Sequence, residues 1–289
     1  MRTFTAKNIV ITGAGSGIGR ALAIELARLN AFLILSDNDS KSLLETQRIL
    51  KDMQIDSACY ELDVSDYQAM NNFATSVYRQ YGDIDMLINN AGVTLMDQFE
   101  DGNLADFHWV MNINFWGTVN GVKAFLPNLL RRKDACIVNL SSIFGIMGMP
   151  GQAAYNSSKF AVKGFTEALK MELSDTSVQV CSVHPGGVKT EIANNARVGI
   201  NTSDVSRAKL LNEFDRLTYT SAEKAAKEAA PIFIIAIKSM TLTDGINILK
   251  GEDDAATKYL NKTTNDSLYK AFKPIVQKAI KSVKVTQYW

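Results

Sequence analysis

The chain has few of the residues that mark metal sites and disulfide scaffolds. Its 289 residues include only three cysteines and two histidines. Cys59, Cys136 and Cys181 each lie in or beside an apolar run and lack the spacing of a zinc site or a disulfide framework, so we expect reduced core residues. His108 and His184 are isolated in the sequence, and for His184 we expect packing alone. The sequence therefore predicts no metal site.

An excess of one charge and long apolar runs are lacking as well. With 31 basic and 30 acidic residues the formal net charge is +1, which gives no support for nucleic acid or an anionic membrane as a partner. The first residues have no hydrophobic signal core, and no apolar run reaches the ~18 residues of a membrane span. We therefore expect a cytoplasmic globular protein that has no membrane span and binds no nucleic acid.

A glycine-rich turn stands between a strand and a helix near the N-terminus. Residues 8–12 are a short β-branched apolar run typical of a buried strand, and a helical apolar pattern begins at Arg20. Glycines between them allow a tight turn and close approach to a pyrophosphate, whose charge the helix N-terminus favours. This context favours a dinucleotide site over a simple tight turn. The cofactor-binding residues predicted here are Gly13, Ser16, Gly17, Ile18 and Gly19.

The spacing of these glycines is Thr-Gly-x-x-x-Gly-x-Gly, because position 18 is Ile and position 20 is Arg. In this the chain resembles the classical short-chain dehydrogenase/reductase family, over residues from about 7 to 220. The resemblance implies an α/β fold with a doubly wound parallel sheet (a Rossmann fold) and helices on both faces of the sheet.

An acidic residue follows the second predicted strand, 32–36. Asp37 lies about 20 residues past the glycines, where a carboxylate accepts hydrogen bonds from a ribose 2′-hydroxyl and repels a 2′-phosphate. Positions 16 and 38 are Ser and Asn, so the basic residues typical of NADP-preferring members of the family are not there. We expect NAD(H) to be preferred over NADP(H); the alternative is a solvated loop acid.

The ends of the next strands supply further residues that the resemblance assigns to the cofactor. We expect helices over 40–54 and 66–81 and strands over 58–62 and 86–88. The resemblance implies adenine contacts after the strand 58–62 and close backbone approach after the strand 86–88, where Asn90 is often structural. The residues are Asp63, Val64, Asn90, Ala91 and Gly92.

Tyr155 and Lys159 lie four residues apart in a segment with a helical apolar rhythm and no proline. Such residues share one face of a helix. A nearby cation favours the phenolate, so the pair could act as a general acid/base near neutral pH. On these residues alone, a solvated helix face remains the alternative.

The family resemblance places this pair in a catalytic tetrad with Asn114 and Ser142. Ser142 follows the predicted strand 135–140 and lies thirteen residues before Tyr155, which is the family's spacing. The resemblance implies that Ser142 orients the substrate oxygen, Asn114 holds a water in a proton relay, and Lys159 lowers the tyrosine pKa and holds the nicotinamide ribose. From the residues alone, an asparagine inside the interrupted helical stretch 104–132 indicates a kink or a polar pair.

Two further segments bear on the substrate side. After the predicted strand 178–183, the resemblance implies contacts to the nicotinamide end of the cofactor from Pro185, Gly186, Val188 and Thr190. The loop 143–151 has almost no polar side chains, which indicates either a lipophilic substrate or packing under a lid. We expect that lid over the polar segment 191–220.

The resemblance to the dehydrogenase family ends near residue 221. We therefore divide the chain into an NAD-binding Rossmann-type catalytic domain, 1–221, and an atypical helical C-terminal segment, 222–289. This tail resembles an uncharacterised family of small helical bacterial proteins. The alternative is a divergent dehydrogenase ending with 247–249 as a short last strand.

Together these motifs predict an oxidoreductase that transfers a hydride between NAD(H) and a lipophilic secondary alcohol or ketone. The alternative is a dinucleotide-sensing or partner-binding protein without turnover, although a sensor needs no proton relay. The resemblance further implies a homodimer or homotetramer built partly on the helices around 104–132 and 153–175.

Overall fold

The computed structural model describes most of the first 200 residues and part of the tail. The described residues are 4–100, 102–186, 188, 192, 196–198, 231–232, 235–237, 239, 241, 243–244, 248 and 255–282. The chain forms two compact units, Met1–Leu210 and Leu211–Trp289. The predicted domain boundary at 221/222 lies outside the described residues and stays a prediction.

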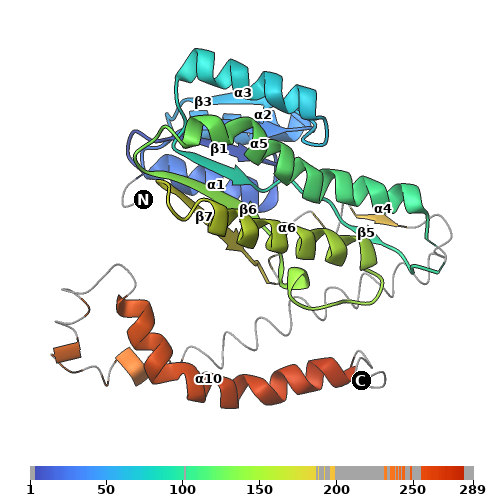
Figure 1. Ribbon diagram of the computed structural model, residues 1–289, viewed down its shortest axis with the longest axis vertical. Helices are drawn as coiled ribbons and strands as arrows, with labels where there is room; N and C mark the ends of the chain where they lie inside the picture. The colour runs from blue at the N-terminus through green and yellow to red at the C-terminus, as the bar shows by residue number, and fades with distance from the viewer. Residues whose placement is uncertain are drawn as a thin grey trace. The chain divides into compact units, whose positions relative to one another are not determined.

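Six parallel strands form the central sheet of the first unit, in the order β3-β2-β1-β4-β6-β7 (Figure 1). From β1 the chain first adds strands on one side, β2 and β3, and then on the other, β4, β6 and β7. Ligands bind such sheets at the carboxyl ends of the strands, near the point between β1 and β4 where this direction changes. The predicted doubly wound fold is confirmed. The strands are β1 Asn8–Thr12, β2 Phe32–Asp37, β3 Ser57–Glu61, β4 Met86–Asn89, β6 Ala135–Leu140 and β7 Val178–Val183.

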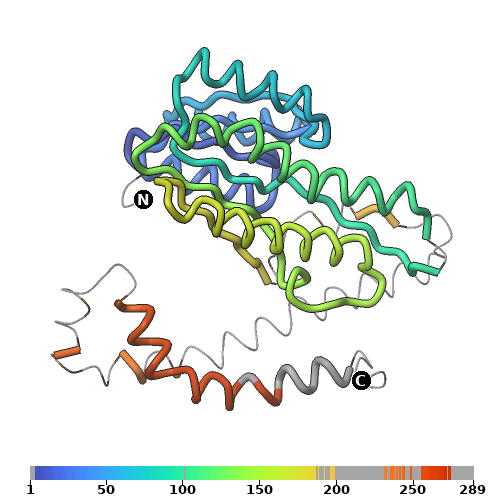
Figure 2. The backbone as a smooth tube through the Cα atoms, in the orientation of Figure 1, coloured from blue at the N-terminus to red at the C-terminus, as the bar shows by residue number. Residues whose placement is uncertain are grey.

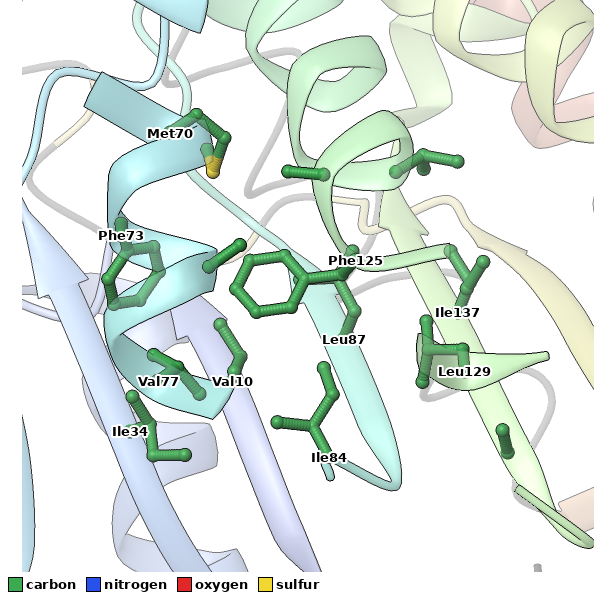
Figure 3. Packing of buried hydrophobic residues seen from close by; sticks show 14 of the residues in the cluster. Val10, Ile34, Met70, Phe73, Val77, Ile84, Leu87, Phe125, Leu129 and Ile137 are labelled. Carbon is green, nitrogen blue, oxygen red and sulfur yellow. The ribbon is translucent and has the colours of Figure 1, made fainter. Parts of the chain in front are cut away.

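Helices cover both faces of this sheet because successive strand residues point to opposite sides. Ile9 and Ile11 pack with helices α1 (Gly17–Arg28) and α2 (Ser40–Asp52). On the other face, Val10 packs with the helices α3 (Tyr67–Tyr81), α5 (Gly117–Leu129) and α6 (Ala153–Glu172). Figure 3 shows Phe125 of α5 at the centre of this second cluster, with its ring edge-on to Phe73 of α3 at 5.6 Å between centroids.

A π-helical turn interrupts the long helical stretch that was predicted over 104–132. It occupies Asn112–Trp116, between α4 (Leu104–Met111) and α5, and Figure 2 shows the backbone continuing through it. Helix α5 can lie close to the sheet because residue 121 is glycine: a Cβ at Gly121 would overlap the Asn89 side chain on β4. The π turn contains Asn114, so the predicted local distortion at this asparagine is confirmed.

Strand β7 differs from the other strands in having one exposed face. Val178 and Val180 are buried against α6, whereas Gln179 and Cys181 are exposed. The expectation that Cys181 is a core residue is therefore wrong. Because side chains alternate along a strand, Cys181 points to the face of the sheet on which α1 and α2 lie. Among the described helices, these two pack mainly on β1, β2 and β3, whereas β7 is at the other edge of the sheet.

Two short elements close to the carboxyl edge of the sheet were not predicted. Strand β5 (Leu95–Met96) pairs in parallel with β8 (Arg197–Val198), and a single 3₁₀ turn, η2 (Ile143–Gly145), follows β6. Of the predicted lid 191–220, only Ile192 and 196–198 are described.

The second unit contains a long helix, α10 (Ala255–Ser282), which confirms a helical C-terminal extension (Figure 1). Its Tyr259 hydroxyl donates to the carbonyl of Ala236 at 3.4 Å. The alternative of a last strand over 247–249 is not what the structure shows at Ile248, which is helical. No helix in the described part of the chain is both long and apolar enough to cross a membrane.

Candidate active site

The glycine turn after β1 is tied to the end of β4. The Asn90 side-chain amide donates to the carbonyls of Thr12 at 3.0 Å and Gly13 at 2.9 Å. Gly13 has a φ of +65°, and a Cβ there would lie 2.6 Å from the Cα of Ala91. Only glycine therefore fits between the two strand ends, and Asn90 has the structural contact that the sequence suggested.

The N-terminus of α1 differs from those of the neighbouring helices. Asp39 and Asp66 cap α2 and α3 by accepting from backbone N–H groups, but Ser16 makes no side-chain capping hydrogen bond at α1. The first N–H groups of a helix carry positive partial charge and need a partner. Because Gly17 and Gly19 leave this end of α1 without bulky side chains beside it, the turn fits an anionic pyrophosphate.

Asp37 ends β2 beside this turn. Its carboxylate accepts from the Gly15 N–H at 2.8 Å and from the Asp39 N–H at 3.0 Å. Arg20 is the basic residue closest in sequence to the turn, but its guanidinium donates to Thr46 and to the carbonyls of Gly15 and Ser42. The carboxylate is therefore held in place by the backbone, with the basic side chain occupied elsewhere.

The two residues predicted to contact the adenine lie just after β3. Val64 is buried, and a Cβ at Gly117 would be 2.6 Å from it. Asp63 is exposed and its carboxylate accepts from the N–H and hydroxyl of Ser65.

Tyr155 and Lys159 are buried on α6, with 8% and 4% of their surfaces exposed, so the solvated-face alternative is excluded. The Lys159 ammonium donates to the Leu140 carbonyl at 2.9 Å and lies 5.7 Å from the centroid of the Tyr155 ring. A Cβ at Gly92 would lie 3.4 Å from Lys159 Nζ and 3.3 Å from Asn114 Oδ1. The structure thus brings the ends of β4 and β6, the π turn and α6 together at one place.

Burial changes the pKa of both groups. It raises the pKa of Tyr155 to about 12, with a hydrogen bond to Ser142 acting in the opposite direction. It lowers the pKa of Lys159 to about 8. The tyrosine shift is opposite to the lowering expected from Lys159, because the loss of water around a phenolate is the largest effect on this group.

Asn114 holds the segment that follows β4 against α6. Its amide oxygen accepts from the Val93 N–H at 2.8 Å, and its amide nitrogen donates to the Val93 carbonyl and the Ser158 hydroxyl, both at 2.9 Å. Both amide hydrogens are used, so a water would have to bind the remaining lone pair of Oδ1 or a backbone carbonyl of the π turn.

Ser142 begins the 3₁₀ turn η2. Its hydroxyl oxygen accepts from the Phe144 N–H at 3.1 Å, and the Phe144 ring meets the Tyr155 ring edge-on at 6.2 Å. His184, for which packing alone was expected, has its Nδ1 3.1 Å from the Ser142 carbonyl oxygen and its Nε2 3.0 Å from the Ser182 hydroxyl. Its position directly after β7, whose end lies beside that of β6, was the signal for this contact.

The segment after β7 also contacts the turn η2 that follows Ser142. The Pro185 carbonyl accepts from the Ile143 N–H at 3.0 Å, and Gly186 and Val188 are joined by a backbone hydrogen bond of 2.7 Å. Thr190 lies outside the described residues. Among the residues that are described, no group of three or more His, Cys, Asp and Glu side chains could hold a metal ion.

The side chains of the apolar loop 143–151 divide between buried and exposed positions. Phe144 is 5% exposed and packs inside, whereas Ile146 and Met147 are 54% and 43% exposed. Apolar side chains that face water beside the tetrad form a surface on which an apolar group can bind.

Family models match both parts of the chain. The model of the short chain dehydrogenase family matches residues 7–200. A model described as a protein of unknown function (DUF4197) matches residues 190–289, in agreement with the resemblance of the tail to an uncharacterised family.

Individual proteins extend the first match. The chain is 42% identical over 229 residues to the candidate oxidoreductase SadH of Mycobacterium tuberculosis, covering 78% of this chain and 82% of SadH. It is 35% identical over 188 residues to the 3-ketodihydrosphingosine reductase of Bos taurus, covering 63% of this chain and 57% of that protein.

A solved structure shares the fold and holds a dinucleotide. A short chain dehydrogenase/reductase from Burkholderia phymatum, crystallised in complex with NAD, is 31% identical and superposes with a TM-score of 0.71 over 82% of this chain and 88% of that one. The chain therefore belongs to the short-chain dehydrogenase/reductase family of oxidoreductases, with a dinucleotide-binding Rossmann fold and a tail that matches a family of unknown function.

Proposed function

We propose that the protein interconverts a secondary alcohol and a ketone with NAD(H). The observation that carries this proposal is the burial of Tyr155 and Lys159 together beside Ser142, at the carboxyl end of β6. When bound, the nicotinamide ring supplies or accepts the hydride. The glycine turn, Asp37 and the segments 63–64, 90–92 and 185–190 would hold the dinucleotide.

The proton steps fall to the side chains of the chain itself. With a pKa of about 12, Tyr155 is protonated at neutral pH and can donate to a ketone oxygen. Lys159, with a pKa of about 8, is largely protonated at pH 7 and favours the phenolate that forms when the tyrosine gives up its proton. The Ser142 hydroxyl, which accepts a backbone N–H and is hydrogen-bonded to Tyr155, would turn its proton toward the substrate oxygen when a substrate binds. Asn114 and the π turn would connect the site to solvent.

Asp37 supports a preference for NAD(H). Its two backbone hydrogen bonds hold a carboxylate at the end of β2, where it can accept from a ribose 2′-hydroxyl and where a 2′-phosphate would meet like charge. The exposed Ile146 and Met147 support a lipophilic substrate, and the bovine relative is named as a reductase of 3-ketodihydrosphingosine.

The test is Tyr155→Phe, assayed by NADH oxidation across a panel of hydrophobic ketones. We expect turnover to fall by at least about a thousandfold, since loss of the proton donor removes general acid catalysis, while NADH binding measured by fluorescence stays intact. Tyr78→Phe is the matched control, because Tyr78 is also largely buried, with a pKa raised to about 12, and donates to the Phe125 carbonyl. Turnover retained by Tyr155→Phe would contradict the proposal.

A dinucleotide sensor or partner-binding protein remains the second candidate, motivated by the tail. Tight NADH binding with no turnover on any ketone of the panel would favour it. The buried Tyr155–Lys159 pair beside Ser142 argues against it, because a sensor needs no proton relay.

We also propose a homodimer or homotetramer. Large apolar side chains face water on the helices concerned: Trp116 in the π turn is 51% exposed, and Phe160 and Met171 on α6 are 44% and 76% exposed. Light scattering after size-exclusion chromatography should give two or four times 31.8 kDa, and a smaller mass for Trp116→Glu. A monomeric wild type would contradict this part of the proposal.

For the domains, we propose that 1–221 with its lid at 191–220 is the catalytic domain and 222–289 a separate segment. Limited proteolysis should then cut first near the junction of the two.

A further inference from the structure

The side chain of Asn156, next to Tyr155 on α6, binds the apolar loop through every group that it has. Its amide nitrogen donates to the carbonyls of Phe144 and Met147, both at 2.7 Å, and its amide oxygen accepts from the Met149 N–H at 3.1 Å. Two carbonyl partners and one N–H partner fix which end of the amide is nitrogen. The side chain is 8% exposed, so these bonds are made away from water, where a lost partner is costly.

The loop that Asn156 holds is the one that positions the reacting groups. Within it, the Phe144 N–H donates to the Ser142 hydroxyl oxygen, and the Phe144 ring packs edge-on against Tyr155. The same residue's carbonyl is the acceptor for Asn156. One peptide segment therefore connects Asn156 to the proton donor and to the group that orients the substrate.

Glycine at position 145 brings this segment against the helix. A Cβ there would be 2.8 Å from the Lys159 carbonyl, and the Gly145 N–H donates to the Ser142 carbonyl at 2.9 Å. The turn η2 therefore lies directly on α6, and loss of the Asn156 hydrogen bonds would allow the segment from Ser142 to Gly145 to move.

We propose that Asn156 is a positioning residue for the reaction: through Phe144 it sets the directions of the Ser142 hydroxyl and the Tyr155 ring toward the substrate oxygen. This inference rests on the proposed function, because it needs Tyr155 and Ser142 to act on a substrate. Asn156 touches no reacting atom; its effect passes through the turn.

The discriminating variants are Asn156→Asp and Asn156→Ala. Aspartate keeps the acceptor for the Met149 N–H but turns an oxygen toward two carbonyl oxygens, so the ionised variant repels the turn. Once protonated, the carboxyl has one O–H that can donate to the Phe144 carbonyl again. Alanine makes none of these bonds at any pH.

We expect kcat of Asn156→Asp at pH 8 to fall by about tenfold to a hundredfold, the size of effect produced by small misplacements of reacting groups. The KM for NADH should not change. As the pH falls from 8 to 5, the kcat of wild type divided by that of Asn156→Asp should decrease by about tenfold or more, because the introduced carboxyl becomes protonated. For Asn156→Ala the ratio should stay constant over the same range.

The alanine variant also serves as the control for other titrating groups. Tyr155 and Lys159 on α6, His184 beside the Ser142 carbonyl and Asp97, whose N–H donates to the Gly151 carbonyl, are the same in both variants. Any pH dependence of theirs is present in the Asn156→Ala profile, so the difference between the two profiles belongs to the introduced carboxyl.

Asn8→Asp is the matched control for stability. Asn8 at the start of β1 also donates its amide hydrogens to two backbone carbonyls, those of Tyr81 at 3.0 Å and Asp83 at 3.1 Å, but at the opposite end of the sheet. It should lower the melting temperature without changing kcat per folded molecule or its pH profile. If Asn156→Asp behaves in this way, Asn156 is structural only and the inference is overturned.

The remaining outcomes separate this inference from the proposed function. If Tyr155→Phe abolishes turnover but the kcat ratio of Asn156→Asp does not narrow at low pH, the inference is wrong and the function stands. If Tyr155→Phe retains turnover, the function itself is wrong and the inference is overturned with it.

Discussion

On the cofactor side of the site, backbone atoms form most of the surface: a glycine turn with no room for a Cβ, an α1 N-terminus without a side-chain cap, and Asp37 held by two N–H groups. On the substrate side, side chains from distant segments hold a loop in place. Asn156 binds this loop and Tyr155 packs against its Phe144 ring, while Arg197 of the strand pair β5–β8 lies over the Trp109 ring of α4.

The difference follows from what each side must recognise. A pyrophosphate needs N–H groups at one fixed spacing, which backbone supplies without long side chains. A substrate differs from one family member to the next, so its side is built from a loop whose residues can be exchanged while the scaffold persists. We therefore expect changes on the cofactor side to alter dinucleotide binding and changes on the substrate side to alter ketone kinetics.

Lys159 lies between the two sides, and its titration should give the largest effect. Burial lowers its pKa from 10.5 to about 8, so between these values the unfolded chain binds more protons than the folded one. Lys159 should therefore raise stability with pH over that window, by on the order of 3 kcal/mol in total. Above pH 9 the thiols of Cys59 and Cys136, whose pKa burial raises to about 11, act in the opposite direction, as does Tyr155 above pH 10, because there the folded chain binds more protons. Urea unfolding from pH 7 to 9 measures the rise before these groups titrate.

Lys159→Met is the control for this titration. It removes the titrating group and should abolish the rise between pH 8 and 9. An equal rise in wild type and variant would show that another group is responsible.

Gly19→Ala tests the backbone surface of the cofactor side. Its Cβ would overlap the Gly13 carbonyl oxygen, and overpacking against backbone costs about 1–3 kcal/mol. We expect NADH to bind about tenfold to a hundredfold more weakly, as measured by fluorescence titration. Gly164→Ala on α6, where a Cβ meets nothing within 4 Å, is the matched control and should leave binding unchanged. Equal NADH affinities for Gly19→Ala and Gly164→Ala would contradict the view that backbone atoms of the glycine turn bind the cofactor.

Asp37→Ala tests the one side chain on which cofactor choice is proposed to depend. Without the carboxylate, the ratio of kcat/KM for NADH over NADPH should fall by about tenfold, since a hydrogen bond to a charged group contributes about 1.5–3 kcal/mol. Asp66→Ala removes a carboxylate that caps α3 after the neighbouring strand, and it should leave the ratio as it is. A ratio unchanged in Asp37→Ala would mean that the acid is a solvated loop residue.

Arg197→Ala should have the smallest effect and only on the substrate side. The Arg197 guanidinium lies 3.6 Å over the Trp109 ring and 3.0 Å from the Asp106 carboxylate, which attaches β8 to α4. Both groups are partly in water, where such contacts contribute about 1 kcal/mol in total. The KM for a ketone should rise by up to about fivefold while the KM for NADH stays the same. Arg48→Ala, which removes an exposed arginine with two ion pairs on α2, should change neither.

Sequence predicted the local elements around the glycine turn well because their signals are local. The turn 13–19, the strand ends at Asp37 and Asn90, and the helix around Tyr155 follow from residues that are near neighbours in the chain. A kink or a polar pair at Asn114 was expected from an asparagine in mid-helix, although its amide hydrogen-bonds to Val93 and Ser158 and not to the backbone of its own helix. The fold class followed from the family resemblance.

Contacts between distant segments were not predictable in this way. The place of His184 directly after β7 puts it near the end of β6, but no spacing in the sequence indicates that its ring reaches the Ser142 carbonyl, 42 residues away. Nothing near Arg197 indicates a ring at position 109. Cys181 was expected inside because its strand is apolar, but burial of a strand face depends on which helices cover it. The direction of the Tyr155 pKa was likewise a matter of burial, which the spacing of tyrosine and lysine does not reveal.

The sequence by itself thus determined the element order and the glycine turn, because these depend on propensity, periodicity and short spacing, and its family resemblance supplied the candidates for the reacting side chains. Only the tertiary structure decided which groups are buried, which carbonyls the buried amides bind, and that Asn156 connects the apolar loop to Tyr155 and Ser142. The physical reason is that desolvation and hydrogen-bond partnership are properties of packed neighbours, and packing brings together residues whose separation in the chain carries no signal of their contact.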